Sequence, residues 1–297
     1  MSVTNGKIKF ANLAATQFIE IAPPVFGYRT MIEFPFTIGE TDDNQRFIYD
    51  EGESFDMRSC EGDVILPISE QAAFNDLFRQ PAASSGVRGQ VITMELPTNS
   101  GFFPFGPDKG DAGLFTVIVE IVAFPTFGDV PFRYFKSRIK ITTVSTTRGV
   151  PVSYPSYSLP AVVSEGGFTI GTVAGNRYPT SAFDNKGSEY GDFKTVTEGN
   201  IAYPVDRSQN ADTWEAKFQM ISNQPNAAAV IKYLSGTARG NAFSIAGDPD
   251  GNYYIFGKDK ASVGAFTVKL TQESIEIIHE NYDRFSYNLN LVYVSGT

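Results

Sequence analysis

Short runs of β-branched and aromatic residues, separated by glycine and proline, dominate the hydrophobic pattern of the chain. In residues 285–291 apolar and polar positions alternate strictly, as on a strand with one buried and one wet face. Similar runs predict eight strands, at residues 30–38, 64–68, 91–96, 114–123, 132–144, 214–221, 265–270 and 285–294. The pattern therefore predicts a mainly antiparallel β-protein.

Two segments show helical spacing instead. Residues 69–78 place apolar side chains three or four positions apart after Ser69, which we expect to be the N-cap. Residues 225–234 begin with Pro225 in the first turn, where the missing N–H costs nothing, and carry one apolar face. With so little helix, the fold class predicted is α+β, mainly antiparallel β.

The two helices belong to an internal repeat. Residues 87–117 and 238–268 align without a gap at an offset of 151, and ten of the 31 aligned positions are identical. Unrelated sequences would share roughly two, so we interpret the chain as a tandem duplication. Glycine and proline cluster with serine and tyrosine in residues 148–160, which places the boundary there.

The duplication predicts two domains, residues 1–149 and residues 150–297. The first is expected to carry an N-terminal arm, and the second a loop-rich N-terminal part. Each unit is expected to have one helix covering a sheet, with a long hairpin attached to the core.

Composition excludes several functional classes. The 297 residues are 42% hydrophobic and carry 24 basic against 33 acidic side chains, a net charge of -9. An electrostatic grip on phosphate or anionic lipid needs clustered lysine and arginine, so specific nucleic-acid or membrane binding is not expected. The single cysteine excludes an intrachain disulfide, and the single histidine excludes a histidine-rich zinc site. No apolar stretch is long enough to span a bilayer, so we expect a soluble protein.

No catalytic, cofactor-binding or metal-binding residue is predicted. His279 is interpreted as a surface or hydrogen-bonded structural histidine. Cys60 is interpreted as a small, partly buried structural cysteine. Residues 248–252 lack the spacing of a calcium loop and predict a hairpin turn. The aromatic pairs Phe102-Phe103 and Tyr253-Tyr254 suit either a carbohydrate platform or, more commonly, core or subunit interface. A pair of catalytic carboxylates stays open as a third hypothesis, but nothing singles one out.

The residues expected to matter are therefore architectural. The Arg-Gly pair after each helix lies where a helix–strand corner needs a positive φ. A repeated glycine follows in the loop, and an aromatic pair is expected in the core of the second copy. These positions are Arg88, Gly89, Arg239, Gly240, Gly113, Gly264, Trp214 and Phe218.

The order of motifs in the second copy resembles a known family. It runs Tyr190-Gly191-Asp192, Glu198-Gly199-Asn200, Thr213-Trp214-Glu215-Ala216-Lys217-Phe218, Ile231-Lys232-Tyr233-Leu234 and Arg239-Gly240-Asn241-Ala242-Phe243. This series of turn, aromatic strand, single helix and glycine-led strand is similar to the minor, or distal, tail proteins at the tip of long non-contractile phage tails. The first copy echoes it with Asp50-Glu51-Gly52 and Arg88-Gly89 but has no tryptophan.

The resemblance implies two tandem tail-tube-like domains, each a β-sandwich or barrel flanked by one helix. It implies a non-enzymatic structural protein of the virion tail, made in the host cytoplasm. Its copies would form a homo-oligomeric ring, with a trimer favoured over a hexamer, between the tail tube and the host-recognition hub. DNA would pass through an acidic lumen without binding. The alternative is a two-domain β-sandwich module that binds carbohydrate or a receptor.

Overall fold

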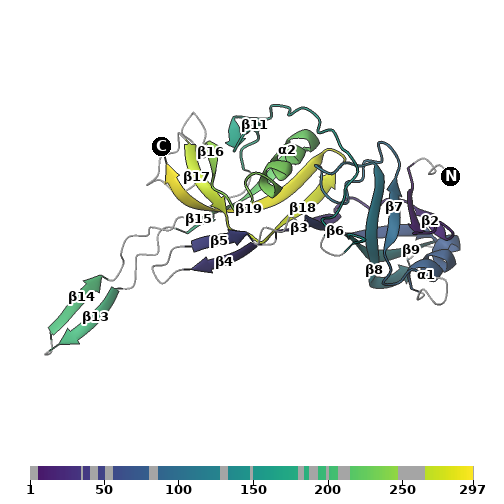
Figure 1. Cartoon of the computed structure of the whole chain (residues 1–297), viewed down its shortest axis with the longest axis horizontal. Coiled ribbons are helices and arrows are strands. Elements are labelled where there is room, and N and C mark those ends of the chain that lie inside the picture. The colour runs from purple at the N-terminus through teal and green to yellow at the C-terminus, as the bar shows by residue number, and fades with distance from the viewer. Residues whose placement is uncertain are drawn as a thin grey trace.

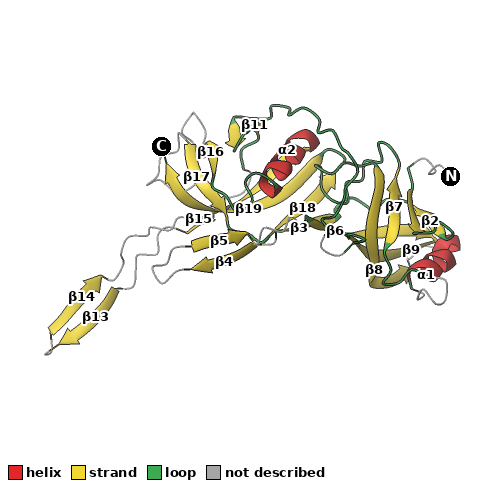
Figure 2. Cartoon of the chain, viewed as in Figure 1, coloured by secondary structure: helices red, strands yellow, loops and turns green. Residues whose placement is uncertain are grey.

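The chain folds as a mostly antiparallel β-structure with two short α-helices (Figures 1 and 2). The structure is a computed structural model that describes residues 6–34, 36–40, 46–50, 56–79, 86–127, 133–147, 150–179, 184–186, 193–198, 201–206, 215–246 and 265–296. Fifteen strands form one open sheet, and four more form two separate hairpins. Below, the first half is the chain up to residue 149 and the second half is the chain from residue 150.

The first half contributes seven strands to the large sheet. They are β1 (Ile8–Asn12), β2 (Phe18–Ile21), β3 (Arg29–Glu33), β6 (Met57–Pro67), β7 (Ile92–Leu96), β8 (Gly113–Phe127) and β9 (Tyr134–Thr143). Their order across the sheet is β3-β6-β9-β8-β7-β1-β2. The hairpin of β4 (Phe36–Glu40) and β5 (Arg46–Asp50) is inserted between β3 and β6. A 3-10 turn, η1 (Ile68–Glu70), and helix α1 (Gln71–Phe78) follow β6.

The second half supplies the other eight strands of the sheet. They are β10 (Phe168–Ile170), β11 (Val173–Asn176), β12 (Asp184–Lys186), β15 (Glu215–Asn223), β16 (Phe243–Ala246), β17 (Ala265–Leu270), β18 (Ser274–Asn281) and β19 (Arg284–Gly296). Helix α2 (Gln224–Ser235) follows β15 directly. The hairpin of β13 (Phe193–Glu198) and β14 (Ile201–Asp206) lies far from the main sheet (Figure 1).

The two halves repeat the same connectivity. In the second half the order is β12-β15-β19-β17-β16-β10-β11, which matches β3-β6-β9-β8-β7-β1-β2 strand for strand. The helix follows the equivalent strand in each half, and the separate hairpin is inserted at the equivalent place. The match extends to register, since Ile92 lies opposite Val117 and Phe243 lies opposite Val268, both at an offset of 151. One strand differs: β17 and β18 together take the place that β8 fills alone.

Each half has its own hydrophobic core. In the first, β-strand residues such as Phe10 and Ile139 pack against the buried face of α1. In the second, residues such as Phe218 and Leu289 pack against α2, whose Ala227, Val230, Ile231 and Leu234 are all fully buried. The apolar face predicted for this helix is therefore confirmed. The helices lie over different parts of the sheet (Figure 2).

The starts of the two helices differ from one another. Asn223 caps α2 by accepting a hydrogen bond from the Asn226 N–H, and Pro225 lies in the first turn as predicted. The prediction of Ser69 as the cap of α1 is wrong. Ser69 lies inside η1, and Glu70 precedes α1 without a side-chain cap. A 3-10 turn at the entry takes over the role of the cap, because its i→i+3 bonds already occupy the first backbone groups.

The observed strands agree with the predicted ones more closely in position than in length. The prediction for residues 265–270 is confirmed, whereas β6 begins seven residues earlier than the predicted residue 64. The single predicted strand 30–38 is two strands, β3 and β4. In the part of the chain that is described, no helix is long and apolar enough to cross a membrane.

Candidate functional site

The two Arg-Gly pairs lie at the corners between helix and strand. Gly89, between α1 and β7, has φ 69°, and Gly240, between α2 and β16, has φ 67°. Both values belong to the left-handed region that glycine adopts without a side-chain clash. Arg88 is exposed and Arg239 is half-buried, so neither arginine is in the core.

The remaining predicted positions divide between core, strand start and parts of the chain that are not described. Gly113 is the first residue of β8, with φ 113°, and a Cβ there would lie 2.7 Å from Cβ of Pro155. Phe218 is 2% exposed and belongs to the core of the second half. Gly264 and Trp214 lie outside the described residues.

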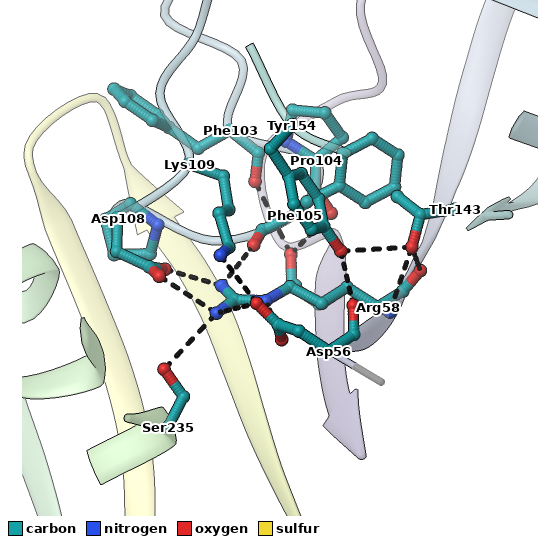
Figure 3. A network of polar contacts seen from close by, with 12 residues as sticks. Asp56, Arg58, Phe103, Pro104, Phe105, Asp108, Lys109, Thr143, Tyr154 and Ser235 are labelled. Carbon is teal, nitrogen blue, oxygen red and sulfur yellow. Dashed lines mark hydrogen bonds and ion pairs between the residues drawn. The ribbon is translucent and has the colours of Figure 1, made fainter. Parts of the chain in front are cut away.

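Those of the predicted residues that the structure describes do not gather into one site. The most elaborate cluster of polar side chains surrounds Arg58 of β6, beneath the loop between β7 and β8 (Figure 3). Its guanidinium is fully buried and donates to both carboxylate oxygens of Asp108, at 2.5 and 2.9 Å. It also donates to the Asp56 carboxylate at 2.7 and 3.1 Å and to the Phe105 carbonyl at 2.6 Å. All of its N–H directions are therefore engaged.

Further side chains surround Arg58 and its two carboxylate partners. Lys109 lies 2.5 Å from Asp56 and 4.3 Å from the ring centroid of Tyr154, whose hydroxyl donates to the Asp56 carbonyl. Thr143 of β9 bonds both the N–H and the carbonyl of Arg58. Two positive and two negative side chains thus balance one another, with Arg58 and Asp108 buried and with Asp56 and Lys109 partly exposed. Such pairing is the condition under which buried charge is tolerated.

The electrostatics follow from this neutral set. Burial by itself would raise the pKa of Asp56, but the charges of Arg58 and Lys109 outweigh burial and hold that pKa below its ordinary value. Burial would likewise lower the pKa of Arg58, and the carboxylates of Asp108 and Asp56 raise it instead. Both shifts favour the charged forms of Asp56 and Arg58, so the ion pair between them is maintained at neutral pH.

The cluster joins the two halves of the chain. Arg58 Nη2 lies 3.4 Å from the Oγ of Ser235, the last residue of α2 (Figure 3). Nearby, Gln224 at the start of α2 donates to the Tyr157 hydroxyl and to the Pro107 carbonyl. The loop carrying Asp108 is therefore held by α2 as well as by β6.

A continuous backbone seam also joins the halves. Strand β3 of the first half pairs with β6 on one side and with β18 of the second half on the other, with Glu33 opposite Ser274 and Arg29 opposite Ile278. The Gly27 N–H donates to the His279 carbonyl at 2.8 Å and continues the ladder beyond β3. This seam makes one sheet out of the two halves.

His279 is buried at the end of this seam. It is 1% exposed, its ring stacks on Phe285 at 4.4 Å, and its Nδ1 shares a hydrogen bond with the Tyr28 hydroxyl. Burial lowers its pKa to about 4, so it is neutral at pH 7. The hydrogen-bonded structural interpretation is confirmed and the surface alternative is wrong. Cys60 is fully buried, more than predicted, and burial raises the pKa of its thiol.

The loop residues Phe102, Phe103 and Phe105 are buried. In the first half the aromatic pair Phe102-Phe103 is therefore part of the core and does not form a carbohydrate platform. The second pair, Tyr253-Tyr254, and the turn predicted at residues 248–252 lie outside the described residues.

A shallow groove of about 510 Å³ crosses the outer face of the sheet at the seam. Its charged walls pair with one another, as Arg29 does with Glu276 at 3.0 Å and Arg138 with Asp63 at 2.9 Å. Neither a histidine ring nor a thiol is among the described residues that line the groove. Within the described ranges, no group of three or more histidine, cysteine, aspartate or glutamate side chains could hold a metal ion. The groove therefore has the chemistry of a paired, polar sheet surface.

Sequence reasoning missed Arg58 and Asp108. One signal was present in the repeat, because Phe105-Gly106 and Asp108-Lys109 recur as Phe256-Gly257 and Asp259-Lys260. Recurrence marked the loop but gave no partner for Asp108, which lies fifty residues from Arg58. Comparison with known proteins adds no name: no protein-family model and no curated protein matches this chain.

Proposed function

We propose that this protein is a non-enzymatic structural component of a phage tail tip, which forms a ring between the tail tube and the host-recognition hub. The observation that carries the proposal is the repeated connectivity: seven strands, one helix and one inserted hairpin occur twice in the same order. A chain with two equivalent building units is suited to a ring, since three copies present six similar units.

The junction between the halves supports a role as an assembly subunit. Ring subunits must hold their two units at a fixed angle, and here the units are joined by the β3–β18 seam, by the contact of Arg58 with Ser235 and by the hydrogen bonds of Gln224. In this proposal the Arg58–Asp108 ion pair holds the loop that contacts α2 in one position, because leaving either buried charge unpaired would be costly. In this proposal each half is a tail-tube-like domain, with boundaries at residues 1–149 and 150–297, and the sheet of each half curves into a sandwich or barrel around its core.

Charge supports a conduit for DNA. With a net charge of -9, the protein would repel a passing phosphate backbone instead of retaining it. The proposal therefore places the protein in the virion tail after synthesis in the host cytoplasm, with tube and hub proteins as neighbours. The alternative binding module draws its support from exposed aromatic loops, and the loop of the first half has its phenylalanines buried.

Mass and shape of the assembled protein test the proposal. The purified full-length chain is examined by native mass spectrometry and by class averages of negatively stained particles. We expect three copies of the 32.5 kDa protomer in a closed ring of six similar lobes, or a hexamer of the same unit. Monomers and dimers alone, at all concentrations tested, would contradict the proposal, and binding on a glycan array by such a monomer would favour the binding module.

A further inference from the structure

The core of the second half is completed by residues of the first half. Ile32 and Phe34, in and just after β3, and Phe103 of the β7–β8 loop are at most 7% exposed and pack within the second core. Ile32 and Phe34 reach it because β3 pairs along the outer edge of β18. Strand β18 thus has neighbours on both sides, β19 within its own half and β3 from the other.

The equivalent place in the first half is open. Strand β8 pairs with β9 along most of its length, to Phe127, but β7 covers its other edge only from Gly113 to Val117. Among the described strands, none pairs with that edge of β8 beyond Val117. The part left open, up to Phe127, corresponds by strand order to β18.

A groove follows this open edge. It has a volume of about 680 Å³ and lies between the end of α1 and β8, lined by Phe78, Arg79, Arg88 and residues 119–122. Val119 is buried whereas Val122 is 50% exposed, so side chains from both faces of β8 reach the groove. That is the arrangement expected where a neighbouring strand is missing from an edge.

The strand equivalent to β3 has a complementary open edge. Strand β12 occupies the position of β3 in the second half and pairs with β15, with Asn185 opposite Ala216. Within the described part of the chain, its other edge has no strand beside it. The described chain therefore has two unpaired edges: that of β8, which is equivalent to β18, and that of β12, which is equivalent to β3.

We propose that the open edge of β8 in one copy of this chain pairs with β12 of a second copy, in the manner in which β18 pairs with β3 inside each chain. The occupant of the α1–β8 groove is thus another copy of the protein. This inference rests on the proposed ring, which it deepens by naming the contact between subunits.

Such a contact is head-to-tail, because the two edges lie on different halves of the chain. Head-to-tail contacts close into a ring when the rotation between successive copies divides a full turn evenly, and otherwise they build an open filament. In a trimer, three seams within chains would alternate with three seams between chains, and the sheet would run continuously around the ring. Pro125 has no N–H to donate, so the seam between chains is expected to be shorter than the seam within them.

The proposed contact gives Arg88 a role in attracting the partner copy. It lines the groove beside Arg79 and is exposed. In the proposed contact both arginines would face the second half of another copy of the chain. Because each copy has a net charge of -9, electrostatic attraction favours this approach.

Disulfide cross-linking tests the contact directly. The only native cysteine, Cys60, is buried with a raised thiol pKa, so the wild-type protein supplies a low background. Two double variants, Ala123→Cys with Asp184→Cys and Ala123→Cys with Lys186→Cys, place thiols on the two edges in neighbouring registers. Under mild oxidation we expect covalent products of two and three chains, which disappear on reduction.

Three controls accompany the test. Glu33→Cys with Ser274→Cys, directly opposite each other in the β3–β18 seam, should link within one chain and leave the mass of a monomer. The single Ala123→Cys variant should remain unlinked. Ala123→Cys with Lys217→Cys, whose second thiol lies one strand farther from the edge on β15, should also remain unlinked.

Native mass spectrometry of the same samples separates the two proposals. Rings that form while neither edge pair links would overturn the seam and leave the ring proposal standing. Failure of both ring formation and cross-linking would overturn both. Products that stop at two chains would also overturn the seam, since in the proposed ring of three or more copies it must link more than two chains.

Discussion

Replacing Asp108 by asparagine tests whether the buried cluster around Arg58 is a charge-balanced unit. The change keeps the size of the side chain and removes one negative charge from a set of two positive and two negative groups. Arg58 is fully buried and has no access to water that could replace the lost partner.

The expected cost follows from the loss of one partner of a buried ion pair, about 3–5 kcal/mol in the free energy of unfolding. That is a large part of the roughly 5–15 kcal/mol that stabilises a typical domain. With an m-value of about 3 kcal/mol per molar urea, the midpoint of denaturation should fall by about 1 M or more.

Urea denaturation at pH 7, followed by far-UV circular dichroism, measures the effect. Asp63→Asn is the matched control, because Asp63 pairs with Arg138 and Lys136, whose side chains are about half exposed, and should cost about 1 kcal/mol or less. The double variant Arg58→Met with Asp108→Asn leaves the Asp56–Lys109 pair intact and should recover part of the loss. A midpoint for Asp108→Asn no lower than that of Asp63→Asn would refute the argument.

Three further outcomes are expected. Gly113→Ala should destabilise the protein more than Gly89→Ala in thermal denaturation, since both glycines have positive φ but only the former meets a neighbour, Pro155 at 2.7 Å. Stability should fall by up to about 3 kcal/mol between pH 6.5 and pH 4, because the unfolded state binds a proton that buried His279 resists, and His279→Phe should remove this part of the pH dependence in urea titrations. Gly240→Val should cost about 1–2 kcal/mol and reduce ring yield by native mass spectrometry; unchanged yield would count against the corner argument.

Arg58 illustrates what sequence patterns leave undecided. Strand β6 starts at Met57, but the run Arg58-Ser59-Cys60-Glu61-Gly62-Asp63 contains too many polar residues to predict a half-buried strand. Alternation is present in the structure, with Arg58 and Cys60 on the buried face. An arginine takes a core position only because Asp108 and Asp56 meet it there.

Local physical chemistry explains the features that the sequence determined by itself. The period of apolar residues depends on which face of a strand or helix is buried, so Ala265–Leu270 and the apolar face of α2 could be predicted. The left-handed corners at Gly89 and Gly240 depend on one residue each, and the repeat is a property of the sequence alone.

The joining of the two halves was decided only by the tertiary structure. The β3–β18 seam brings residue 29 beside residue 278, and nothing in either strand specifies the other, because antiparallel strands of mixed polarity can pair in many combinations. The choice depends on side chains that arrive from elsewhere, such as Ile32 and Phe34, which fill the second core. The same reason leaves the edge of β8 open: its sequence resembles that of a paired strand, and only the fold shows that its neighbour is absent from the described chain.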